Sequence, residues 1–162
     1  MTDLSALSAW IAATPLSLTI QTTSWVIPTV QSVHILAISV VVASSAMLNL
    51  RLAGLIGREQ SVQLMAQRFM PPVWWALPVL ALTGLTLIIG EPKRELLNPY
   101  FWSKMIILLT VIIITVPLQH QLEDRPFRQL PQGKQRLVRT GALVCLLLWL
   151  GIIICGRWIA YA

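Results

Sequence analysis

The sequence predicts an all-α membrane protein, a polytopic four-helix bundle preceded by a short N-terminal interfacial helix. Apolar residues make up 56% of the 162 residues and charged residues only 11%, whereas a soluble domain usually carries about 25% charge. The mean hydropathy is strongly positive, and the charges fall between four long uncharged windows. Because so little polar surface cannot cover a globule in water, the composition excludes a cytosolic enzyme and a disordered chain.

The uncharged windows define the spans. They contain no Asp, Glu, Lys or Arg and run over Leu4–Leu50, Phe69–Gly90, Met105–Leu122 and Thr140–Gly156. A span needs roughly 17–25 mostly apolar residues, so each of the last three windows holds one. In the first window, seven of the eleven residues at 14–24 are Thr, Ser or Gln, which places its span after Pro28. We predict one membrane domain over 1–162, with spans near 28–50, 73–90, 101–119 and 139–157.

The segment before the first span, about 4–24, is expected to lie at the membrane interface. Leu4, Leu7 and Ile11 would share one side of a helix, with Trp10 beside them, a pattern typical of an interfacial helix. The first residues include Asp3 and lack the basic segment that opens a secretory signal, so no such signal is expected.

Loop charge predicts the orientation. The connectors at 51–72 and 119–138, with Arg139 at the edge of the second, carry eight of the twelve basic residues, and excess positive charge marks the cytoplasmic side. Both termini should therefore lie outside, in the periplasm if the chain belongs to the inner membrane of a Gram-negative bacterium. The basic residues form no single patch, so the net charge of +6 does not indicate a nucleic-acid partner.

Three ionisable residues near the outer ends of the spans are the main candidates for function. His34 lies in the first span, Lys104 near the start of the third and Arg157 at the end of the fourth. Ionisable groups at membrane depth are functional candidates, because an imidazole in hydrocarbon costs free energy unless a metal or a hydrogen bond compensates. The structural alternatives are a hydrogen-bonded packing histidine, a lysine that extends to the interface, and an arginine anchor beside Trp158.

These residues are predicted to lie at one depth. His34 would be about 9 Å and Lys104 about 5 Å inside their helix starts, and Arg157 would lie at the same boundary. One imidazole and two cations match the needs of a haem, which takes an axial nitrogen on iron and positive groups beside its propionates. Bundles build cofactor sites from facing side chains in this way.

Other residues are weaker candidates. His120 ends the third span about 24 Å from Lys104, so one iron within a protomer cannot bind both histidines; it is an interfacial histidine or a second metal site. Met105 and Met47 are possible soft ligands or packing residues. Gly84 would let another helix or a flat macrocycle approach closely. The cysteines, Cys145 and Cys155, lack the spacing of a disulfide within one helix, and no motif for covalent haem occurs.

Three segments resemble a superfamily of small bacterial four-span membrane proteins. They are QSVHILAISVVVASSAMLNLRLAGL, NPYFWSKMIILLTVIIITVPLQH and LWLGIIICGRWIAY. The superfamily includes HemJ-type protoporphyrinogen oxidases, CopD-like copper-resistance proteins and an uncharacterised family of about 160 residues, which the last segment resembles closely. The resemblance implies non-covalent haem b, with His34 important and Lys104 nearby. The polar N-terminal stretch and the basic connector before the last span depart from the HemJ pattern, so haem binding is the shared expectation.

We therefore expect a membrane-embedded b-type haem protein with a redox or electron-transfer role, for which a haem-dependent oxidoreductase is the enzyme class to test. His34 would be the axial ligand, Lys104 or Met105 a second ligand, and Arg157 a propionate partner. A CopD-like copper protein and a cofactor-free assembly protein are the alternatives. Expected partners are the lipid bilayer, further copies of the chain in a homo-oligomer, and a quinone or a redox protein.

Overall fold

The computed structural model describes residues 2–57, 59, 61–124, 127, 130–159 and 161, and for residues 2 and 118–124 it describes the backbone only. The described residues form seven helices and no strand. In chain order these are α1 (Thr2–Ala12), α2 (Pro15–Thr22), α3 (Val26–Ala53), α4 (Val62–Gly90), α5 (Pro92–Leu96), α6 (Pro99–Asp124) and α7 (Gln132–Trp158).

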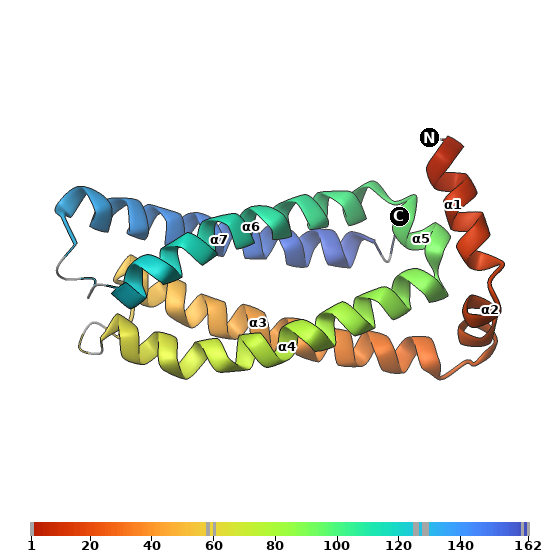
Figure 1. Cartoon of the computed structure of the whole chain (residues 1–162), viewed down its shortest axis with the longest axis horizontal. Helices are drawn as coiled ribbons and strands as arrows, with labels where there is room; N and C mark the ends of the chain where they lie inside the picture. Colours follow the sequence, from red (N-terminus) through yellow and green to blue (C-terminus); the bar gives the residue numbers. More distant parts are fainter. Residues whose placement is uncertain are drawn as a thin grey trace.

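Four of these helices, α3, α4, α6 and α7, are long and apolar enough to cross a membrane. They lie roughly along one axis, while α1, α2 and α5 gather at one end together with both termini (Figure 1). We call this the capped end and the opposite one the loop end. The predicted four-span all-α bundle with a short N-terminal helix is confirmed, and both termini do lie at the same end.

The helix boundaries follow from local capping. The Thr14 side chain accepts a hydrogen bond from the backbone N–H of Ser17, with Pro15 in the first turn of α2. Ser61 caps α4 by accepting from the N–H of Leu64. Gly54, at φ 79°, ends α3 in the left-handed conformation that favours glycine.

Two helical segments were not expected from the sequence. α2 occupies the polar stretch at 14–24, and the bend between α1 and α2 is 68°. α4 begins at Val62, well before the predicted position 73, and continues through Pro71 and Pro72. Charged residues mark the edge of the hydrocarbon, but a helix capped in the polar region can extend beyond it, and prolines are tolerated in membrane helices.

The bundle is assembled around α3, which packs along both α4 and α7, while α6 packs along α7. α4 and α6 touch each other only sparsely. An apolar cluster fills the middle of the bundle; its buried members are Ala37, Val41, Ala76, Val111, Trp149 and Ile152. A second cluster, nearer the loop end, includes Leu48, Leu52, Met65 and Val138. A third, smaller cluster lies at the capped end, with Leu96, Phe101 and Ile159 as its buried members.

At the capped end, α2 is held against the end of α4. The Ser17 side chain is fully buried, and its hydroxyl donates a hydrogen bond to the carbonyl of Ile89 at 2.6 Å. Beside it, Gly90 has no room for a side chain, since a Cβ there would lie 2.5 Å from Ile27 Cδ1 and 2.9 Å from Ile20 Cγ2.

This contact predicts that Gly90→Ala destabilises the capped end. The added methyl would force Ile20 and Ile27 to move, and overpacking of this kind typically costs about 1–3 kcal/mol. Thermal unfolding in a mild detergent should show a lower midpoint. Gly156→Ala is the matched control, because nothing lies within 4 Å of a Cβ at that helical position; its midpoint should stay the same or rise. Equal midpoints for wild type and Gly90→Ala would contradict the tight docking of α2.

Candidate functional site

His34 faces the interior of the bundle. It lies three residues before Ala37 and seven before Val41 on α3, so the three side chains share one helix face. Ala37 and Val41 are buried, whereas the imidazole is only half-buried. The imidazole therefore lies at the edge of the buried core, between α3 and α4, and part of its surface stays exposed.

One hydrogen bond orients the imidazole. Its Nδ1 lies 2.7 Å from Thr83 Oγ1 on α4, and that hydroxyl donates its own hydrogen to the backbone carbonyl of Val79 at 2.6 Å. Because a hydroxyl has a single hydrogen, the neutral ring must donate Nδ1–H to Thr83. The hydrogen-bond pattern therefore assigns the Nδ1–H tautomer, in which Nε2 carries the lone pair that can bind a metal.

Gly84 allows the ring to approach α4. A Cβ at Gly84 would lie 3.6 Å from His34 Cε1, which is van der Waals contact, so any side chain larger than a methyl would meet the imidazole. The predicted role of Gly84 in close packing is thus found between α3 and α4, with His34 as the group that approaches.

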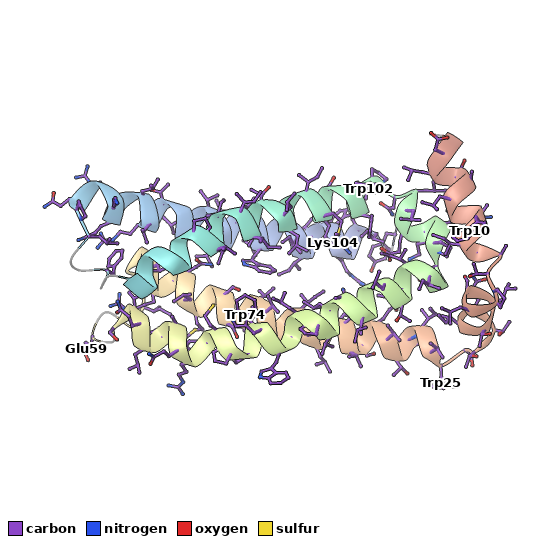
Figure 2. All side chains as sticks on the ribbon, viewed as in Figure 1. Trp10, Trp25, Glu59, Trp74, Trp102 and Lys104 are labelled. Carbon is purple, nitrogen blue, oxygen red and sulfur yellow. The ribbon has the colours of Figure 1, made fainter. Side chains whose placement is uncertain are left out.

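Lys104 lies on α6 at the same end of the bundle (Figure 2). Its Nζ is 5.3 Å from the centroid of the Phe101 ring, within the range of a cation–π interaction. The lysine charge lies within electrostatic reach of His34, and Glu95 and Cys155 lie within reach of the lysine. Glu95, on α5, is buried. Lys104 therefore interacts electrostatically with a carboxyl group on α5 and with the imidazole on α3.

All four spans contribute a polar side chain to this region: His34 from α3, Thr83 from α4, Lys104 from α6 and Cys155 from α7. We call these four residues the polar cluster. Each is half-buried, although each lies one or two turns from a buried residue of the mid-bundle apolar cluster on the same helix. The polar cluster thus lies between the mid-bundle apolar cluster and a smaller apolar cluster at the capped end, whose buried members are Leu96, Phe101 and Ile159.

The remaining predicted residues lie elsewhere. Met105 is 42% exposed, so it faces away from the polar cluster although it adjoins Lys104 in sequence. Arg157 is exposed; it donates a hydrogen bond to the Tyr161 hydroxyl, and its Cζ lies 4.7 Å from that ring's centroid. It therefore shares the capped end with His34, but its described contacts are with Tyr161.

Two further candidates lie toward the loop end. Met47 packs against the apolar cluster there. His120 belongs to α6, 16 residues beyond Lys104, and its side chain lies outside the described part of the chain.

Sequence reasoning missed three members of this region. Thr83 adjoins Gly84, for which close packing was predicted. A hydroxyl side chain beside that glycine was the signal that could have identified Thr83 as a partner of His34. Cys155 was considered only as a disulfide partner or in a motif for covalent haem, and Glu95 was not considered. Among the described residues, no group of three or more His, Cys, Asp or Glu lies close enough to hold a metal ion. The site therefore offers one well-oriented imidazole nitrogen, with a cation nearby.

Comparison with known proteins places the chain in a family. No curated protein matches it, and no solved structure matches it either. One family model does match, over residues 9–162, which include every residue of the polar cluster and all four spans. The chain belongs to this family, a family of unknown function termed DUF6644.

Proposed function

We propose that this protein binds haem b within the membrane and has a redox or electron-transfer role, with His34 Nε2 as the axial ligand. The observation that carries the proposal is the hydrogen bond from His34 Nδ1–H to Thr83, which leaves Nε2 as the free nitrogen. Proteins commonly orient metal-binding histidines through such a bond from the second ring nitrogen. The resemblance of the first and third spans to HemJ-type proteins supports the same cofactor.

The other residues of the polar cluster fit this group. A single imidazole is an incomplete set of ligands for a bare metal ion, but it suffices for iron whose other ligands come from a macrocycle. Lys104 would supply a cation for a propionate or a second nitrogen ligand, and as a second ligand it suits the site better than Met105, which faces outward. Arg157 is exposed near the same end and could meet a propionate only by leaving Tyr161. When bound, haem would supply reversible one-electron chemistry.

The copper alternative has less support, because Cu(I) prefers several soft ligands and Cys155 is the only sulfur in the polar cluster as defined above. The absorption spectrum of the purified protein distinguishes the proposals. A Soret band with a sharp α-band on reduction supports haem b. A colourless protein with stoichiometric copper supports the CopD-like function, and a colourless protein without metal supports a cofactor-free assembly role.

We also propose that the protein lies in the bacterial inner membrane with its capped end toward the periplasm. This orientation predicts that an impermeant thiol reagent labels intact cells at Leu97→Cys and not at Gln132→Cys, in a background without Cys145 and Cys155. Leu97 is suited to labelling because it is 48% exposed, whereas its neighbour Asn98 is 6% exposed. Labelling at position 132 in intact cells would reverse the orientation.

We also propose that the protein forms a homo-oligomer. Glycines in spans can also let separate copies approach closely, but three of them contact the chain's own side chains: Gly84 faces His34, Gly141 faces Ile114 and Gly151 faces Ile107. They are therefore used in packing within the bundle. The support for an oligomer is therefore the haem itself. If the haem lies at a subunit boundary beside the half-buried His34, a second copy is needed to cover it.

A further inference from the structure

The capped end carries a second polar site, separate from the polar cluster. A shallow pocket of about 390 Å³ lies where the end of α1 and α2 meet the turn between α4 and α5. Its polar lining consists of Gln21, Glu91, Lys93 and Arg94. Two cations against one carboxylate leave the pocket with a net positive charge, which favours an anionic ligand.

Arg94 has an unused donor in this pocket. Its Nη1 donates to Glu91 Oε2 at 2.6 Å, whereas its Nε is buried and makes no hydrogen bond to any described residue. A buried donor without an acceptor costs free energy. Nε and Nη2 form one edge of the guanidinium, and such an edge binds two oxygens of a phosphate in parallel. The ion pair with Glu91 thus leaves this edge without a described partner, and a rotation of the partly exposed Arg94 side chain would turn it toward the pocket.

The position of the pocket indicates where the phosphate comes from. The long apolar helix α4 ends at Gly90, beside the pocket, and Trp10, Trp25 and Trp102 surround this end of the bundle (Figure 2). Exposed tryptophans are typical of the boundary between hydrocarbon and headgroups.

The exposed side chains of the two N-terminal helices also indicate that the capped end lies at this boundary. On α1, Leu7 and Trp10 are exposed, whereas Ser8 is buried. On α2, Leu16 is exposed and Ser17 is buried. Exposed leucines and a tryptophan on short helices suit the interface between lipid and water, which places the pocket at headgroup depth.

We infer that this pocket binds the phosphate of a membrane phospholipid, with the Nε edge of Arg94 and the ammonium of Lys93 as its partners. The lipid would join α1 and α2 to the α4–α5 turn, because the pocket is lined by all of these segments. Gln21 is held in place there, since its Nε2 donates to Ser17 Oγ at 2.9 Å.

The test titrates the delipidated full-length protein, in a mild detergent, with dioleoyl phosphatidylglycerol and counts bound lipids by native mass spectrometry. Wild type should retain one lipid more tightly than the rest. Loss of a bidentate, charge-assisted contact should weaken that lipid about tenfold or more in Arg94→Gln. Arg94→Lys keeps the charge but loses the paired donors, so it should recover only part of the affinity. Arg136→Gln, an exposed arginine at the start of α7, is the charge-matched control and should bind as wild type does.

Inorganic phosphate, titrated in the same assay, shows whether the bound phosphate group belongs to a lipid headgroup or to free phosphate. If phosphate fails to displace the retained lipid, the lipid headgroup is the ligand. If phosphate alone binds in an Arg94-dependent way and no lipid is retained, the lipid assignment is overturned. Equal lipid retention by wild type and Arg94→Gln, with matched helical circular dichroism, overturns the site itself. Lys93→Gln provides a second variant should Arg94→Gln fail to fold.

Discussion

His34→Ala is expected to abolish the low-spin haem spectrum while the protein still inserts into the membrane. Removal of the imidazole would leave the iron with at most one weak protein ligand, so haem should be lost or become high-spin. The bundle itself should tolerate the change, because His34 is only half-buried. Thr83 would lose one accepted hydrogen bond but would still donate to the carbonyl of Val79. The measurement is the reduced and oxidised absorption spectrum of purified protein at matched membrane yield.

His120→Ala is the control for this prediction. It lies 16 residues farther along α6 than Lys104, about 24 Å along a helix, and should leave the spectrum unchanged. If His120→Ala removes haem and His34→Ala does not, the site lies at the loop end and the polar cluster is not the haem site. A requirement for both residues would mean two haems, or an iron shared between protomers.

Thr83→Val is expected to weaken haem binding by about 10–100-fold, the usual effect of removing the hydrogen-bond partner of a metal-binding histidine. Valine matches threonine in shape but cannot accept the Nδ1–H hydrogen bond of His34. The ring would then lose both its fixed tautomer and its fixed orientation. Thr83→Ser is the matched control, because it keeps the hydroxyl and should retain most of the affinity. Haem titration of the delipidated protein, followed by the Soret band, measures the effect.

The same variant can be tested without haem. The ¹⁵N chemical shifts of His34 in the haem-free protein report which ring nitrogen carries the proton, and wild type should show protonated Nδ1. In Thr83→Val the two tautomers should exchange. Protonated Nε2 in wild type would contradict the assigned hydrogen bond and remove the main support for the haem proposal. If Nδ1 is protonated but the protein binds no haem, the His34–Thr83 hydrogen bond is confirmed and only the haem proposal is overturned.

Much of the architecture follows from the sequence because hydrocarbon restricts the choices. A backbone in lipid must satisfy its hydrogen bonds internally, so four uncharged windows can only be four helices or part of a barrel, and their length selects helices. Charge alone was a poor guide to helix ends, as α4 shows: Arg68 marks the edge of the apolar window, yet the helix begins at Val62. Capping by Ser61, a local signal, decides that boundary.

The sequence by itself determined the number of spans and the approximate depth of His34 and Lys104, since depth depends only on helical rise and on where each span begins. It did not determine which residues face one another. The spans α3 and α6 are apolar on nearly every side, so no polar face sets their rotation about the helix axis. Packing of α3 against α4 and α7 sets the rotation of α3, and with it the Thr83 hydrogen bond. Packing of α6 against α7 sets the rotation of α6, and with it the exposure of Met105. The tertiary structure therefore decided which nitrogen of His34 is free, because that depends on a hydroxyl 49 residues away in the chain.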